Sequence, residues 1–123
     1  RRDVPRLLAA MDIFMLSSLW EGLPRVIPQA MMLRLPVIAN RADGTGEVIQ
    51  NGVNGYLCIP GDIRQMANYG IQLILDPLTR REMGSRGQEL ALQEYDLHKM
   101  IHQIEELYDS LLSRSSAHRD QKR

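Results

Sequence analysis

The sequence predicts an α/β fold with a parallel sheet and helices on both of its faces. Three short apolar runs contain no polar residue, which is typical of strands buried on both faces. They are Ile13–Leu16, Val37–Ala39 and, with a tyrosine at its start, Tyr56–Ile59. Segments with a helical pattern separate these runs, and such alternation favours a parallel sheet. Beyond Pro60 and Gly61 the pattern is helical, so C-terminal helices complete the fold.

Capping and breaking residues mark where the expected helices begin and end. The helices cover residues 4–10, 25–33, 44–50, 63–75, 78–94 and 97–112. Asp3 and Asp62 stand at N-cap positions, and Asp76-Pro77 ends the fourth helix. Its apolar positions are Ile63, Met66, Ala67, Ile71, Ile74 and Leu75. The last helix has a regular apolar stripe at Leu97, Met100, Ile101, Ile104, Leu107, Tyr108 and Leu111.

Size and composition limit the classes of protein. A chain of 123 residues can form one compact domain, which we place at residues 1–113, followed by a disordered tail over 114–123. Fifteen basic residues balance fifteen acidic ones, which argues against a nucleic-acid partner. The single Cys58 allows no internal disulfide and fits a cytoplasmic location. No apolar run is long enough to span a bilayer.

The segment after the first expected strand is the most informative for function. It reads Ser18-Leu19-Trp20-Glu21-Gly22-Leu23-Pro24, with Gln29 eight residues after Glu21. A carboxylate thus lies in a tight loop, and a polar side chain lies near the start of the next helix. Backbone N–H groups and a helix N-terminus at such a place suit a sugar attached to a diphosphate. Ligands of open α/β sheets bind at the carboxyl ends of the strands, where this loop lies.

This segment resembles the signature of the retaining nucleotide-sugar glycosyltransferases of the GT-B fold, glycosyltransferase family 4 (glycosyl transferases group 1). Their E-x₇-E motif begins in an S-x-x-E-G-x-P loop. Glu21 matches the first Glu, but Gln29 replaces the second. The resemblance covers nearly all of residues 3–112. It implies that the chain is a fragment, the later part of a Rossmann-like C-terminal domain that binds the donor, without its upstream strands.

The resemblance implies a role for each matching residue. Glu21, as the catalytic candidate, and the amides of Gly22 and Leu23 contact the donor sugar and its phosphates. Gln29 corresponds to the Glu that holds the ribose hydroxyls. A neutral amide accepts more weakly than a carboxylate, so donor binding should fall about tenfold. From the residues alone, Glu21 could be a solvated loop carboxylate that favours the following helix N-terminus, and Gln29 could mark a site that no longer binds nucleotide.

Two further candidates lie in the glycine-rich turn that opens the third expected helix. Gly44 resembles the family's glycine that exposes amides to phosphate, and Glu47 follows it. Glu47 could instead only complement the helix dipole. Arg34 stands where the family usually has Gly at a helix end, so a strained backbone is one expectation there.

The resemblance implies transfer of a sugar from a nucleoside diphosphate sugar to a hydroxyl acceptor, with retention and without a cofactor or an obligatory metal. The acceptor would come through a separate N-terminal domain, and the isolated fragment would be inactive. A nucleotide-sugar epimerase and a non-catalytic nucleotide-binding or scaffold module are the alternatives. A peripheral membrane association of the parent protein is left open.

Overall fold

A computed structural model describes residues 3–20, 22, 24–42, 44–96, 98–99 and 101–109. The chain divides into two units, one ending at Leu92 and the other beginning at Gln93. The tail expected over residues 114–123 and the domain boundary expected at residue 113 lie outside the described residues.

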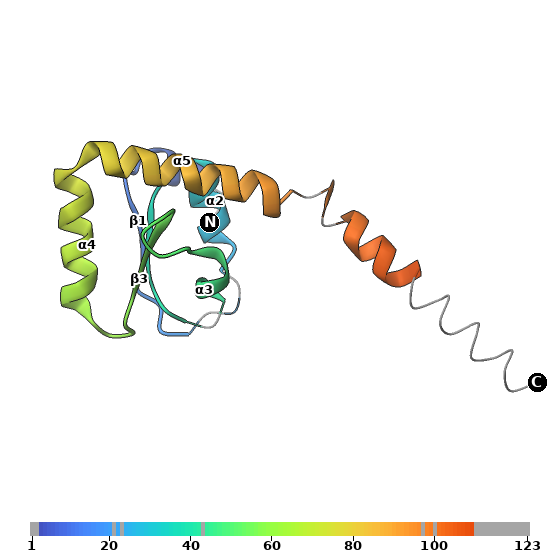
Figure 1. Cartoon of the computed structure of the whole chain (residues 1–123), viewed down its shortest axis with the longest axis horizontal. Helices are drawn as coiled ribbons and strands as arrows, with labels where there is room; N and C mark the ends of the chain where they lie inside the picture. Colours follow the sequence, from blue (N-terminus) through green and yellow to red (C-terminus); the bar gives the residue numbers. More distant parts are fainter. Residues whose placement is uncertain are drawn as a thin grey trace, which may run out of the picture. The chain divides into compact units, whose positions relative to one another are not determined.

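The elements follow the predicted order, with ends shifted by at most two residues (Figure 1). They are α1 (Val4–Ala9), β1 (Phe14–Leu16), α2 (Val26–Met32), β2 (Val37–Asn40), α3 (Thr45–Val48), β3 (Gly55–Cys58), α4 (Ile63–Leu75) and α5 (Pro77–Glu94). Asp62 caps α4 as expected, because its side chain accepts a hydrogen bond from the Gln65 amide. Asp3 occupies the N-cap of α1 without a side-chain capping bond.

The three described strands form a parallel sheet in the order β1-β2-β3. Val37 pairs with Phe14 on one side and with Gly55 on the other, so β2 is the central strand. All four residues of β2 are buried, as an uninterrupted apolar run predicts. Figure 1 shows α4 on one side of the sheet and α2 and α3 on the other. The predicted α/β class, with helices on both faces, is confirmed.

β1 forms one edge of this sheet, and among the described residues it pairs only with β2. Met15 at its centre is 46% exposed. An open edge strand with apolar side chains is a template for pairing with another chain. We therefore expect residues 1–123 to self-associate, whereas a chain extended upstream stays monodisperse. Light scattering over a range of concentrations tests this expectation, and a stable monomer of residues 1–123 would contradict it.

The face of α4 that packs on the sheet differs from the expected one. Leu73 and Gly70 are buried. The exposed apolar side chains of this helix are Ile63, Ile71, Ile74 and Leu75. The orientation of α4 about its own axis has a physical cause. Tyr69 of this helix stacks on Tyr56 of β3, with ring centroids 4.1 Å apart. Of the apolar positions noted in the sequence of this helix, Met66 packs against the core cluster.

The core on the α4 side of the sheet is formed by Ile38, Cys58, Leu73 and Met83. Met83 comes from α5, so this helix contributes to the same cluster. Burial raises the pKa of the Cys58 thiol, and the charge of Asp62 adds to the effect. The thiol therefore stays protonated at neutral pH and is a core side chain, because the thiolate is the reactive form.

α5 passes very close to the turn between α2 and β2. Arg34 in this turn has a φ of 59°, the left-handed conformation considered from the sequence. Gly84 of α5 lies directly against the Arg34 carbonyl group, where any side chain would collide with the backbone. One turn along α5, the Gln88 amide accepts a hydrogen bond from Arg34 Nε at 2.7 Å and donates one to the Met32 carbonyl oxygen at 2.8 Å.

In the second unit, residues 98–99 and 101–109 are helical. Of the expected apolar stripe, the described side chains Ile101, Ile104, Leu107 and Tyr108 are exposed. Leu97, Met100 and Leu111 lie outside the described residues. His102 Nε2 lies 3.3 Å from Glu106 Oε1. Within the described ranges, no cluster of three metal-ligating side chains occurs, and no helix has the length and apolarity that a bilayer crossing demands.

Candidate functional site

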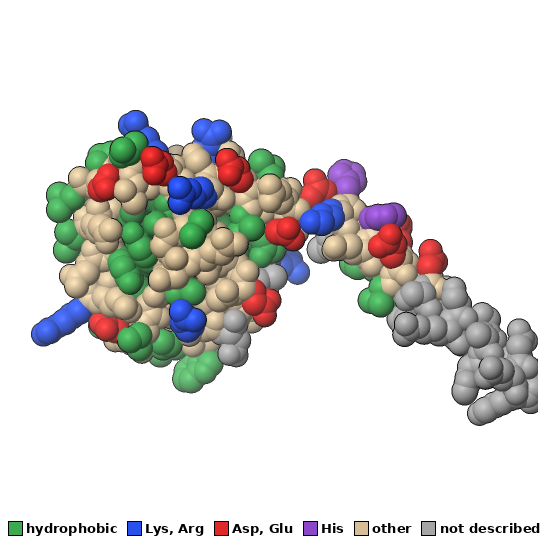
Figure 2. Space-filling view, viewed as in Figure 1, with side chains coloured by type: hydrophobic (Ala, Val, Ile, Leu, Met, Phe, Trp, Pro, Cys, Tyr) green, Lys and Arg blue, Asp and Glu red, His purple; other side chains and the backbone are tan. Residues whose placement is uncertain are grey.

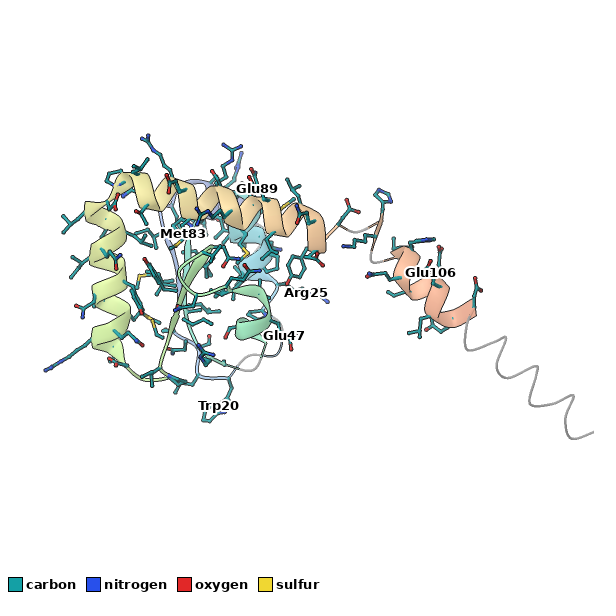
Figure 3. All side chains as sticks on the ribbon, in the orientation of Figure 1. Trp20, Arg25, Glu47, Met83, Glu89 and Glu106 are labelled. Carbon is teal, nitrogen blue, oxygen red and sulfur yellow. The ribbon has the colours of Figure 1, made fainter. Side chains whose placement is uncertain are left out.

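The loops that follow the three parallel strands lie at one edge of the sheet, which we call the carboxyl edge. Ser17 begins the loop after β1, Arg41 the loop after β2, and Ile59 the loop after β3. In Figure 3, Trp20 and Glu47 lie toward the end of this unit opposite α5. The candidates Gly22 and Gly44, which lie on two of these loops, therefore share the edge at which such folds bind ligands.

Asn40, at the end of β2, fixes the loop after β1. The residue is 4% exposed, and its Nδ2 donates to the Ser17 carbonyl oxygen at 2.8 Å and to that of Ser18 at 3.4 Å. Since Ser18 begins the S-x-x-E-G-x-P loop, Asn40 helps to set where this loop starts. Asn40 was not among the residues predicted for the site. The sequence did contain one indication of its role, which is a polar side chain at the end of a buried strand.

Thr45 folds the glycine-rich turn between β2 and α3. Its buried hydroxyl accepts a hydrogen bond from the Ala42 amide at 2.9 Å and can donate to the carbonyl oxygen of Ala42 at 2.7 Å or Asn40 at 2.9 Å. The turn before Gly44 is thus held by side chain to backbone bonds. Thr45 was not predicted from the sequence either, because the turn was recognised from its glycines.

The predicted site residues occupy different surroundings. Gly22 and Glu47 are exposed, and Gly44 is buried at the N-cap of α3. Glu47 lies in the first turn of α3, so the helix-dipole interpretation fits its position. Glu21 and Leu23 lie outside the described residues. That these residues face one cleft with Gln29 stays a prediction.

Gln29 lies on α2 beside an open pocket of about 250 Å³. Its other lining residues are Pro5, Leu8, Met32 and Leu33, from α1 and the end of α2. A polar amide therefore stands at an apolar hollow. This combination of apolar walls and one polar group is common in sites for small organic ligands.

A second pocket, of about 240 Å³, lies at the carboxyl edge itself. It is lined by Ser17, Leu19, Asn40, Gly61, Asp62, Ile63 and Met66. Asn40 connects this pocket with the loop that carries the motif, because it both lines the pocket and holds Ser17. The carboxyl edge therefore has a hollow adjacent to the S-x-x-E-G-x-P loop.

The parallel sheet and the loops at its carboxyl edge define an α/β domain of the kind that binds nucleotides. The family of glycosyl transferases group 1 matches this chain over residues 1–90, and the chain belongs to that family. The identification made from the S-x-x-E-G-x-P loop is thereby confirmed.

Curated relatives agree with the family. The chain is 37% identical over 110 residues to N-acetyl-alpha-D-glucosaminyl L-malate synthase of Bacillus anthracis, covering 89% of this chain and 29% of that protein. It is 30% identical over 108 residues to UDP-Gal:alpha-D-GlcNAc-diphosphoundecaprenol alpha-1,3-galactosyltransferase of Escherichia coli, covering 88% of this chain and 28% of that protein. The chain thus spans less than a third of the length of either relative.

Solved structures share the fold. Anabaena HepE in complex with UDP-glucose has a TM-score of 0.85 and 36% identity, over 89% of this chain and 30% of HepE. The C-terminal domain of the glycosyl transferase group 1 family protein LpcC from Francisella tularensis has a TM-score of 0.73 and 30% identity, over 77% of this chain and 49% of that one. The predicted Rossmann-like sheet of a GT-B C-terminal domain is confirmed by this agreement.

Proposed function

We propose that the parent protein is a glycosyltransferase that moves a sugar from a nucleoside diphosphate sugar to a hydroxyl acceptor with retention, and that this chain carries part of the donor site. The observation that carries the proposal is the 36% identity, at a TM-score of 0.85, to a protein solved with UDP-glucose bound. The family match over residues 1–90 includes Glu21, Gly22, Leu23 and Gln29.

In this proposal each group at the carboxyl edge acts on the donor. Glu21 contacts the sugar, while the amides of Gly22 and Leu23 and the turn at Gly44 approach the diphosphate. Stabilising the departing diphosphate and fixing both substrates supply the catalysis, with no other cofactor. Glu47 adds a hydrogen-bond acceptor near the same turn.

The acceptor, in this proposal, binds to an N-terminal domain that this chain does not include. We place the parent protein in the cytoplasm. The name of the Escherichia coli relative includes a lipid-linked diphosphate. An acceptor of that class would bring the parent protein to a membrane surface as a peripheral protein.

Transfer assays on the full-length protein test the proposal. Incubation with UDP-sugars and hydroxyl acceptors should give a glycoside of retained configuration, read by proton NMR of the anomeric signal. An epimerase would convert the bound sugar without an acceptor, and a non-catalytic module would bind the donor without turnover. The non-catalytic module is the second candidate because Gln29 stands where the family has a Glu, so a neutral hydrogen-bond acceptor replaces a charged one.

Gln29→Glu in the full-length protein should tighten donor binding about tenfold, because a carboxylate accepts charge-assisted hydrogen bonds from two ribose hydroxyls. Isothermal titration calorimetry with UDP-glucose measures the change. Gln50→Glu is the matched control, because Gln50 is also exposed but lies outside the pocket of Gln29. Unchanged or weaker binding by Gln29→Glu would show that Gln29 does not hold the ribose or that the pocket has adapted to the amide.

A further inference from the structure

A third pocket, lined by charged residues, lies at the edge of the sheet where the strands begin, next to the pocket of Gln29, with which it shares Leu33. Its volume is about 220 Å³. Its lining includes Asp12, Leu33, Arg34, Leu35, Arg80 and Arg81. Asp12 precedes β1 and the Leu33–Leu35 turn precedes β2, whereas the two other arginines come from α5. In Figure 2, Lys and Arg side chains stand along α5 together with acidic ones.

Arg34 is held in a defined orientation at this pocket. Its Nε donates to the Gln88 side chain at 2.7 Å, and Gln88 is fixed in turn by its bond to the Met32 carbonyl oxygen. This arrangement uses Nε, and within the described residues neither Nη group of Arg34 has a hydrogen-bond partner. Two parallel N–H donors of one guanidinium match two oxygens of a phosphate. Arg34 has this geometry despite a φ of 59°, which an L residue adopts only at a cost.

The lining of the pocket contains three arginines and one acidic residue, so its charges do not balance. Asp12 is the one acidic residue of the lining, and its carboxylate lies 3.9 Å from Arg80 Nη2 with 82% of the side chain exposed. An exposed pair at that distance neutralises little. Arg80 Nη1 is anchored on the Leu73 carbonyl oxygen at 3.0 Å. Arg81 is exposed and has no hydrogen-bond or ion-pair partner in the part of the chain that the structure describes.

We propose that this pocket binds an oxyanion of the phosphate class, either inorganic phosphate or a small phosphomonoester, separately from the donor. Its volume lies below the roughly 300–1,000 Å³ of pockets for drug-sized ligands, so it suits a small ion. Leu35, only 4% exposed, gives the hollow an apolar wall. Such a wall strengthens the attraction between the guanidinium groups and an anion. The bound ion would join the α2–β2 turn to α5.

Calorimetric titration of residues 1–123 with inorganic phosphate, at ionic strength held constant with sodium chloride, tests the proposal. We expect saturable binding at about 1 mM, a modest affinity. Arg81→Gln should weaken it about tenfold, because charge-assisted hydrogen bonds to phosphate are lost. Arg86→Gln is the matched control: Arg86 is exposed on the same helix and lies outside the pocket, and the charge change is identical.

The variant Arg34→Gly tests phosphate binding separately from any loss of folding stability. Glycine adopts a φ of 59° without strain, so this variant should unfold at the same or a higher temperature than the wild type in the absence of phosphate. Phosphate should nevertheless raise its unfolding temperature less than that of the wild type. Non-saturable binding to the wild type, or equal weakening by Arg86→Gln and Arg81→Gln, would overturn the proposal.

Discussion

Gly84→Ala should destabilise the chain by about 3 kcal/mol, the upper part of the usual range for overpacking. A Cβ at this position would collide with the Arg34 carbonyl oxygen and lie 2.8 Å from its carbonyl carbon. Neither atom can move without shifting the backbone of the turn, so α5 would have to move away. That shift would also break the bonds of Gln88 to Arg34 and Met32. Urea unfolding at low protein concentration, followed by circular dichroism, measures the loss.

Gly87→Ala is the control for Gly84→Ala, because it makes the same substitution three residues along the same helix. Its Cβ would lie 3.4 Å from Met31 Cγ, an ordinary contact with a flexible side chain. The gain in helix propensity, up to about 1 kcal/mol, should leave this variant as stable as the wild type or more so. Similar losses in both variants would mean that helix α5 does not depend on the close approach at Gly84.

The sheet could be predicted because buried strands leave a signal in the sequence. Val37–Ala39 reads as an uninterrupted apolar run, and the structure buries every residue of β2. The close approach of Gly84 to Arg34 left no comparable signal. It depends on two segments fifty residues apart in the sequence, and a glycine within a helix is otherwise only a weak helix former.

Some residues of the candidate site could be predicted from the sequence and others could not, again because only local patterns are visible in it. The S-x-x-E-G-x-P loop is a local motif, so its residues could be recognised from their spacing, although Glu21 and Leu23 lie outside the described residues. Asn40 acts across two strands, since its side chain reaches the carbonyl oxygen of Ser17. Thr45 folds its own turn through buried hydrogen bonds, but threonine is common at such positions, and the sequence does not distinguish it.

Helix α4 shows the limit of reasoning from apolar pattern alone. Apolar residues occur around most of this helix, so several stripes satisfy the helical period equally well. Ile71 and Ile74 fit one stripe, yet they are exposed, while Leu73 is fully buried. Residues elsewhere in the chain determine which face of α4 is buried. Tyr56 stacks on Tyr69, and Ile38 and Met83 pack around Leu73.

Leu73→Ala should therefore destabilise residues 1–123 by about 3 kcal/mol, the cost of losing a buried side chain and leaving a cavity. Ile74→Ala, one residue further along α4, should change stability by no more than about 0.5 kcal/mol, since Ile74 is 62% exposed. Both variants remove a large aliphatic side chain from one helix, and the β-branched isoleucine gives Ile74→Ala only a slightly larger gain in helix propensity. Urea unfolding under the same conditions compares the two. If Ile74→Ala were the more damaging substitution, α4 would pack through the face that its apolar pattern first suggested, and the stacking of Tyr69 on Tyr56 would not determine its orientation.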